Sequence, residues 1–370
     1  EKISELDKPT GLKGNELMRS DTTQDARDLI SAGRRNKIIN GAMLIDQRHN
    51  GSSNSSSNGY HTDRFRTQAA GMDQLNQSYQ QVSDGPDGFP KSLKITTNTA
   101  ESNIASTGEY LALYQKIEGQ NLQDLAYGTI SAKPVTVSFY VKSSITGTFC
   151  YTVYRNETTD RAINKTYTID NANTWERKSI NIPAYTTDYS PNADHNNGFD
   201  IDWNLSSGPD DIMDPFTWQT ASTAARGVTG QVNMLDTIGN YFCLTNVQVE
   251  LGDVATPFEQ RLYTEELARC QRYFYKMKNG SSSSYWVGQT SSYGSNNNIT
   301  IIHLPVCMRD NPSMATSALA SDFQVWGNAT VENLSNLPTL RGMNGINPQA
   351  IPIDITHNIT TGETRVLRMS

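Results

Sequence analysis

Short stretches in which apolar and polar residues alternate recur along this chain, and they restrict its fold more than any other feature. Residues 134–142, PVTVSFYVK, are the clearest example. A period of two residues places successive side chains on opposite faces of a β-strand. Loops separate the stretches without a strand–helix–strand rhythm, so the pattern predicts an antiparallel β-sandwich. The other stretches lie at residues 91–97, 110–117, 149–153, 175–182, 199–205, 241–244 and 247–251.

The length of this strand-rich part favours one kind of sandwich. Residues 37–262 span about 225 positions, and about eight strands or more are expected there, which is typical of a jelly roll. An immunoglobulin-like sandwich is nearer about 100 residues. The sequence has no internal repeat of the kind that builds a β-helix or a propeller. We therefore predict an all-β chain whose largest domain is an antiparallel jelly-roll β-sandwich.

Residues 246–275 separate this sandwich from the C-terminal part of the chain. The stretch 247–251 alternates as a half-buried strand does. Glu265 and Glu266 then place favourable negative charge near the start of an expected helix over residues 263–275. Apolar residues recur there every three or four positions, as along one stripe of an amphipathic helix: Tyr263, Leu267, Cys270 and Phe274.

The last expected unit, residues 263–370, consists of this linking helix and a small β domain. Alternation at residues 299–304, 323–325 and 351–355 predicts strands, and prolines between them keep the strands short. Few large apolar side chains are available, so the core is expected to be thin. Small domains of this kind are often completed by oligomerisation. We predict a second, smaller β-sandwich.

Residues 1–36 form the first expected unit. They are polar, and one short helix is expected from Thr22 or Thr23, either of which can cap it, to Gly33. Its apolar surface is too small for a core of its own. We expect an N-terminal arm that becomes ordered against another protein or a sister subunit.

Several motifs carry a resemblance to a known family. Residues 35–48 read RNKIINGAMLIDQR, residues 247–261 read VQVELGDVATPFEQR, and residues 265–275 read EELARCQRYFY. With these and with residues 116–149, 173–183 and 307–313, the chain resembles tail-fibre and minor tail proteins of bacteriophages, of marine phages especially, that carry a carbohydrate-binding-like jelly-roll module.

The resemblance implies a virion protein that is assembled in the cytoplasm of the bacterial host. It implies a tail fibre or spike that binds host-surface polysaccharide, with the arm attaching it to other tail or capsid proteins. The alternative is a purely structural adaptor, or a capsid or neck fibre, without a ligand of its own. A glycan-degrading enzyme is the least favoured hypothesis.

Charge and composition argue against other partners. The formal net charge is −7, and Lys and Arg form no cluster that could neutralise phosphates, so no nucleic-acid partner is expected. No run of about 18 apolar residues occurs, so membrane insertion is not expected. Four widely spaced cysteines without a CxxC pair indicate buried thiols: Cys150, Cys243, Cys270 and Cys307.

The polar motifs do not predict chemistry. Asp200, Asp202 and Asn204 resemble the start of a calcium loop, but Leu205 stands where that loop needs glycine. Strand alternation explains the same residues as a face turned to water. The histidines are scattered, and the carboxylate pairs lie in polar or helix-surface contexts. We predict no catalytic residue, no metal site and no cofactor.

The segment 185–218 mixes aromatic residues with Asn and Asp, the side-chain types that bind sugars. Aromatic rings stack on the C–H faces of sugars, and amides and carboxylates pair with the hydroxyl groups. Trp203 shares the apolar phase of Phe199 and Ile201, so a core position is its alternative. The predicted ligand-binding residues are Tyr185, Tyr189, Trp203 and Trp218.

Quaternary structure is expected to be a homotrimer. Tyr273 and Tyr275 lie off the apolar stripe of the linking helix, so they are available to a neighbouring subunit. The alternative is that both cover the upstream sandwich within one chain. The number three comes from the resemblance to phage fibres.

Overall fold

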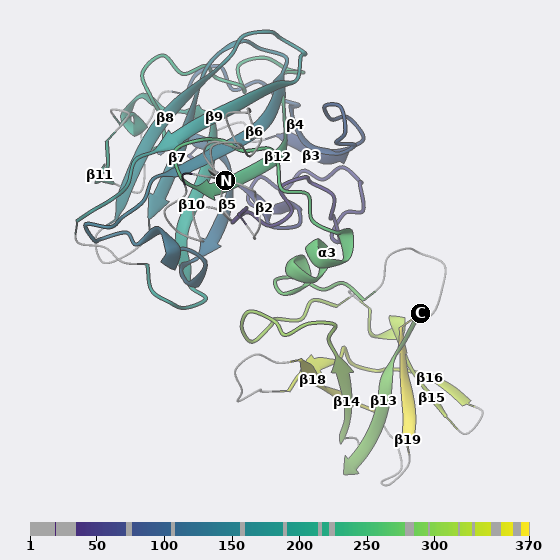
Figure 1. Cartoon of the computed structure of the whole chain (residues 1–370). Coiled ribbons are helices and arrows are strands. Elements are labelled where there is room, and N and C mark those ends of the chain that lie inside the picture. The colour runs from purple at the N-terminus through teal and green to yellow at the C-terminus, as the bar shows by residue number, and fades with distance from the viewer. Residues whose placement is uncertain are drawn as a thin grey trace, which may run out of the picture.

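The protein is described by a computed structural model in which the β-sandwich, the linking helix and the smaller sheet are all placed (Figure 1). The described residues are 19, 35–71, 76–104, 108–155, 160–187, 191–213, 217–221, 226–277, 285–294, 297–316, 319–327, 330–341, 349–357 and 364–369. The expected N-terminal arm therefore lies almost entirely outside them.

Two antiparallel sheets form the larger unit. The first has the order β1 (Tyr60–Thr62), β2 (Phe65–Ala70), β5 (Tyr110–Glu118), β10 (Asn197–Ser207), β7 (Gly147–Arg155), β8 (Arg161–Ile169) and β11 (Gln219–Thr220). The second has the order β3 (Gln77–Val82), β4 (Ser92–Thr97), β12 (Tyr241–Leu251), β6 (Val135–Ser143) and β9 (Glu176–Ile182). Short 3₁₀ turns lie at Gly119–Asn121, Gln123–Leu125, Pro209–Asp211 and, in the smaller unit, Ala320–Asp322.

The strand order identifies the sandwich as a jelly roll. Eight strands carry the topology, and in chain order they are β4, β5, β6, β7, β8, β9, β10 and β12. The first, eighth, third and sixth lie side by side in one sheet, and the second, seventh, fourth and fifth in the other. Two Greek keys wound in this way are the definition of the fold. The predicted fold class is confirmed.

The core lies between the two sheets and is rich in aromatic rings. Phe139 of β6 meets Trp203 of β10 edge-on, with ring centroids 5.6 Å apart. Phe139 also contacts Tyr167 of β8 at 5.1 Å, and Phe149 of β7 contacts Phe242 of β12 at 5.8 Å. Phe139, Trp203, Phe149 and Phe242 face inward through the alternation of strands that the sequence predicted, which is why the pattern located this part of the core.

One expected strand pair is a single strand. Residues 241–244 and 247–251 both belong to β12, which continues through a bulge between Thr245 and Gln248. Asn246 makes this possible with a φ of 52°, a left-handed conformation that asparagine tolerates better than most residues. The bulge shifts the apolar phase, so the sequence looked like two strands.

The linking helix, α3, runs from Tyr263 to Gln271 and is shorter than expected. Its predicted apolar stripe is only partly buried. Leu267 and Cys270 pack against Ile39 and Ile45 of the sandwich, whereas the side chain of Tyr263 is 57% exposed. The helix is thus fastened to the segment that enters the sandwich.

The two tyrosines expected to face another subunit are covered within the chain. The Tyr273 hydroxyl donates a hydrogen bond of 2.5 Å to Glu118, and the guanidinium of Arg64 lies 3.5 Å from its ring centroid. Tyr275 packs against the core of the smaller unit. The alternative interpretation therefore holds for Tyr273, and the helix surface no longer supports a trimer.

The smaller unit, for which a sandwich was predicted, is one seven-stranded antiparallel sheet within the described residues. Its order is β16 (Thr330–Asn333), β15 (Phe323–Gly327), β19 (Thr364–Met369), β13 (Tyr285–Gly294), β14 (Asn297–His303), β18 (Ala350–Thr356) and β17 (Thr339–Leu340). The expected strands near residues 299–304, 323–325 and 351–355 are all present. Its core gathers on one face of the sheet, around Val325, Ile353 and Leu367.

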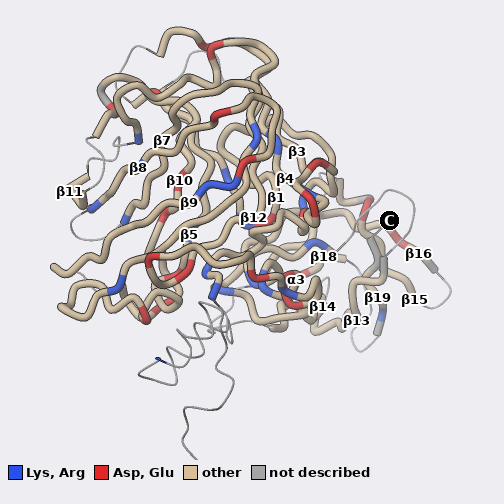
Figure 2. The backbone as a smooth tube through the Cα atoms, turned by 45° about the horizontal axis from the view of Figure 1, so that its top comes forward, with Lys and Arg blue, Asp and Glu red and all other residues tan. Residues whose placement is uncertain are grey.

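Other expectations concern cysteines, charge and membranes. Cys150, Cys243 and Cys270 are buried thiols, whereas Cys307 is exposed. Basic and acidic residues are interspersed around α3 (Figure 2). Among the described residues, no helix is both long enough and apolar enough to cross a membrane.

Candidate functional site

The four predicted ligand residues lie in different surroundings. Trp203 is fully buried between the two sheets, where its ring contacts Phe139 and Tyr151. Its prediction as a ligand residue is wrong, because its alternation with Asp202 and Asn204 turns it into the core. Tyr189 lies outside the described residues, as does Phe216, its aromatic neighbour in the sequence.

The structure brings Tyr185 and Trp218 together. Their ring centroids are 5.4 Å apart in an edge-on arrangement. The indole nitrogen of Trp218 donates to the Pro183 carbonyl at 2.9 Å, and the Tyr185 hydroxyl accepts from Nε of Arg161 at 3.1 Å. Trp218 also meets Tyr127 edge-on, and both predicted residues belong to the edge of the core. Their ring faces are used within the chain, so they form a structural cluster.

Asp200, Asp202 and Asn204 do not face water as expected. They lie on the face of the seven-stranded sandwich sheet that is turned away from the core, which we call the outer face, and all three are buried. The registers place one row of polar side chains across five strands of this face: Arg66, Tyr114, Asp202, Thr152 and Asn164.

A chain of hydrogen bonds crosses the outer face and ends at Gly227. This residue and Arg226 belong to a segment that covers the face. Nδ2 of Asn204 donates to the Thr152 hydroxyl at 2.7 Å, and that hydroxyl donates to Oδ1 of Asn164 at 2.7 Å. Nδ2 of Asn164 then donates to the carbonyl of Gly227 at 2.9 Å. Met213 and Ala221, which precede Arg226 and Gly227 in the chain, pack on Tyr154 and Ala162. The sequence pattern could not show that the segment around Arg226 and Gly227 covers this face.

Arg226 supplies the charge that opposes Asp202. Its guanidinium forms an ion pair with the fully buried Asp202 carboxylate and lies 5.0 Å from the ring centroid of Tyr110. Burial raises the pKa of the Asp202 carboxyl to about 7, although Arg226 opposes that shift. Burial also raises the pKa of Asp200, against the pull of Lys116.

A carboxyl with a pKa near neutrality is often catalytic. Asp202 is instead closed off by its partner and by the strands around it, as a structural ion pair is. Oδ1 of Asp202, Oδ1 of Asn204 and Nε of Arg226 are buried without a hydrogen-bond partner among the described groups. Such atoms normally bind ordered water. Within the described ranges, no three His, Cys, Asp or Glu side chains gather as metal ligands.

An exposed pair of aromatic side chains lies in the smaller unit and was not predicted. Trp286 of β13 and Trp326 of β15 have ring centroids 4.8 Å apart, with planes inclined by 34°. Their side chains are 51% and 43% exposed. β19 runs between their strands and pairs with both, and the registers put the two indoles on the face opposite the core.

The surroundings of this tryptophan pair combine one charged residue with amides and apolar side chains, because the strand registers place Arg368 of β19 opposite both Trp286 and Gln324. Gln324 donates to the Asn333 side chain at 2.9 Å, and Val331 lies opposite Trp326 with 48% of its surface exposed. Ile301 is in the same cross-strand row and is also exposed. An exposed apolar patch with amides at its margin is typical of a recognition surface. A signal was present in the sequence, since Tyr285-Trp286-Val287 stands out from a Ser- and Asn-rich segment.

Comparisons with solved structures gave distant likenesses. A tailspike domain of bacteriophage CBA120, described as enzymatically active, matches at 13% identity and a TM-score of 0.31 over 58% of this chain and 21% of that one. The family 11 carbohydrate-binding module of a Clostridium thermocellum cellulase matches at 14% identity and a TM-score of 0.27, over 56% of this chain and 99% of that module. A xylan-binding domain from Paenibacillus barcinonensis matches at 14% identity and a TM-score of 0.30, over 54% of this chain and 98% of that domain.

The chain thus spans about a fifth of the length of the tailspike domain. No family model and no curated protein matches the sequence.

Proposed function

We propose that this protein is a bacteriophage virion protein, a tail fibre or spike, that binds host-surface glycan without cleaving it. The observation that carries the glycan part is the exposed pair Trp286 and Trp326, whose indoles lie 4.8 Å apart on the outward face of the smaller sheet. Two indoles and the nearby amides Gln324 and Asn333 combine an apolar stacking surface with hydrogen-bonding groups. The C–H faces of sugars can stack on the indoles, and the hydroxyl groups of sugars can form hydrogen bonds with the amides.

The virion part rests on the sequence. The motifs at residues 35–48, 247–261 and 265–275 occur in the order found in phage tail proteins, which supports a place on the particle after assembly in the bacterial cytoplasm. Residues 1–36 are proposed to attach the protein to other tail or capsid proteins. Deleting them should leave a folded protein that is missing from purified particles, and normal incorporation would refute this role.

Binding to glycan is tested with purified protein and polysaccharide from host cells. Trp286→Ala and Trp326→Ala should each weaken binding at least about tenfold, which corresponds to about 1.4 kcal/mol. Tyr263→Ala is the matched control, because Tyr263 is an exposed aromatic on α3 and is 57% accessible. Equal losses in all three variants would contradict a site at the tryptophan pair.

The same experiment separates the competing functions. A protein that binds no host polysaccharide fits the adaptor or neck-fibre alternative. Shortened polysaccharide chains after incubation would show a glycan-degrading enzyme instead.

A homotrimer remains part of the proposal through the resemblance to phage fibres. Light-scattering mass decides the point: about 41 kDa is the mass of one chain, and a trimer has three times that mass.

A further inference from the structure

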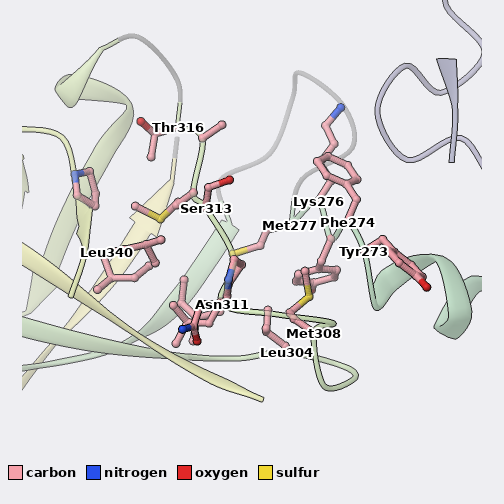
Figure 3. A pocket seen from close by; sticks show the side chains of 18 of the residues that line it. Tyr273, Phe274, Lys276, Met277, Leu304, Met308, Asn311, Ser313, Thr316 and Leu340 are labelled. Atoms are coloured by element: carbon pink, nitrogen blue, oxygen red, sulfur yellow. The ribbon is translucent and has the colours of Figure 1, made fainter. Parts of the chain in front are cut away.

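A large apolar cavity lies between the core face of the smaller sheet and the segment that follows α3 (Figure 3). Its volume is about 940 Å³. In the close-up, Met277, Met308 and Leu304 lie together on the side of that segment, and Leu340 lies across the cavity from Phe274. The strands contribute further apolar side chains: Val287, Ile302, Ile353 and Leu367.

The architecture explains why the cavity exists. Among the described residues the smaller unit has one sheet, so its apolar face packs against no second sheet, and residues 272–277 and 304–316 cover its rim. An apolar space of this size is neither well solvated nor well packed. Pockets that hold organic ligands are roughly 300–1,000 Å³ and mostly apolar. Methionines at such a site adapt to flexible hydrocarbon.

A second, smaller pocket of about 140 Å³ adjoins the cavity and has the opposite character. The two share Arg48, Tyr273, Phe274 and Arg309 as lining residues. Arg64 completes a set of three guanidinium groups around the small pocket. Within the described part of the chain, Asp63 is the one acidic residue that lines it.

Three guanidinium groups and one carboxylate line the small pocket, and Asp46 is a second carboxylate that acts on Arg48 from outside this lining. Asp63 is engaged by Arg48, at 3.7 Å, and by the side chain of Gln47. Arg309 donates to the carbonyl of His195 at 3.1 Å, and Arg64 donates to the carbonyl of Lys116.

Arg64 is 7% exposed, and its Nε atom is buried and has no hydrogen-bond partner among the described groups. A buried cation with an unused donor favours an anion nearby. Burial also lowers the pKa of Arg48, a direction that a bound anion would oppose.

We propose that the two pockets together bind an anionic amphiphile. Its hydrocarbon chain occupies the cavity beside Met277 and Met308, and its carboxylate or phosphate head lies against Arg64 and Arg309. A free fatty acid and a phosphorylated membrane lipid share this chemistry. The inference concerns a site distinct from the tryptophan pair and does not rest on the proposed glycan binding.

The test titrates the full chain with cis-parinaric acid, a fluorescent fatty acid, followed by displacement. Oleate and a short-chain phosphatidic acid should both displace the probe, and the stronger of the two identifies the source of the ligand. A neutral maltoside detergent of similar chain length should compete at least tenfold more weakly. Absence of saturable binding, or equal competition by the neutral amphiphile, would overturn the proposal.

Variants assign the two parts of the site. Arg309→Gln and Arg64→Gln should each weaken oleate binding about tenfold while leaving the neutral detergent unchanged. Met308→Trp fills the cavity and should abolish binding of both. Arg269→Gln is the matched control, since Arg269 lies on α3 and pairs with Glu265 at 3.1 Å outside both pockets.

Thermal melting of each variant guards against misfolding, because Arg64 also packs on Tyr273. Folded arginine variants that bind oleate normally would refute the head-group site. A folded Met308→Trp protein that still binds the probe would refute the cavity as the chain site. Loss of glycan binding in the Trp286→Ala protein, with oleate binding intact, would show that the two proposals stand separately.

Discussion

The guanidinium of Arg226 and the carboxylate of Asp202 form an ion pair that holds the segment around Arg226 against the outer face of the jelly roll. The Asp202 side chain is inaccessible to solvent, and that of Arg226 is 9% exposed. Arg226 also lies over the ring of Tyr110, so one side chain joins the segment to two neighbouring strands, β5 and β10. Burying both charges makes this contact sensitive to the loss of either partner.

Replacing Arg226 by methionine should destabilise the protein by about 3 kcal/mol at pH 8, because the Asp202 charge is then buried without its partner. Urea unfolding measures the change. Arg341→Met is the matched control, since Arg341 pairs with Asp354 at 3.5 Å on the surface and should cost less than about 1 kcal/mol.

The cost of Arg226→Met should depend on pH. The pKa of Asp202 is raised to about 7, so the native state binds a proton that the unfolded chain releases near pH 4, and stability falls as pH rises through that window. Without Arg226 the pKa is higher still, and the variant continues to lose stability above pH 7. The difference from the unchanged protein should therefore be larger at pH 8 than at pH 6. A difference independent of pH would contradict this account.

His61 should contribute to acid unfolding. Its ring stacks on Tyr79 with centroids 3.8 Å apart, and burial lowers its pKa to about 3. Below about pH 6.5 the unfolded chain binds a proton that the native state does not, so stability is lost as pH falls from there toward 3. His61→Gln should flatten the slope of unfolding free energy against pH in that window. An unchanged slope would show that other groups dominate acid unfolding.

Two adjacent glutamates on α3 should differ strongly in importance. Glu266 is 8% exposed, pairs with Arg261 at 3.3 Å and accepts a hydrogen bond from the backbone of Asn40. Its replacement by alanine should cost about 2 kcal/mol, because it leaves the buried N–H group of Asn40 without an acceptor and removes one of the two carboxylates that pair with Arg261. Glu265→Ala removes a partly exposed helix pair with Arg269, a kind of pair that contributes about 0.5 kcal/mol, and should cost less than Glu266→Ala. Chemical denaturation of both variants makes the comparison.

The sequence predicted most of the sandwich because inward residues such as Trp203 and Phe139 follow the strand period without interruption. β8 was missed although it pairs with neighbours on both sides in the first sheet, β7 and β11. Its inward positions include Lys165 between Ile163 and Tyr167, which breaks the apolar pattern. Period-two alternation reports two faces of a strand, and a single polar residue on the inner face is enough to hide it.

The candidate sites were harder to predict, since they depend on contacts between distant parts of the chain. The polar face of Asp202 was assigned to water because its cover, the segment around Arg226, comes 24 residues later in the sequence. Trp286 and Trp326 are 40 residues apart and meet only because both strands pair with β19. No local pattern encodes either relationship.

The bulge in β12 gives the sharpest test of how backbone conformation competes with strand propensity. Asn246 is 2% exposed and has a φ of 52°. Valine is the better strand former, so propensity alone predicts that Asn246→Val stabilises the protein. A left-handed conformation instead places the valine Cβ against the following carbonyl, and we expect a loss of about 1–2 kcal/mol. Asn246→Gly is the control, because glycine adopts this conformation freely and should cost much less than valine. Urea midpoints for the two variants decide the matter: a valine variant as stable as the glycine one would mean that β12 straightens and that its register beyond Thr245 shifts.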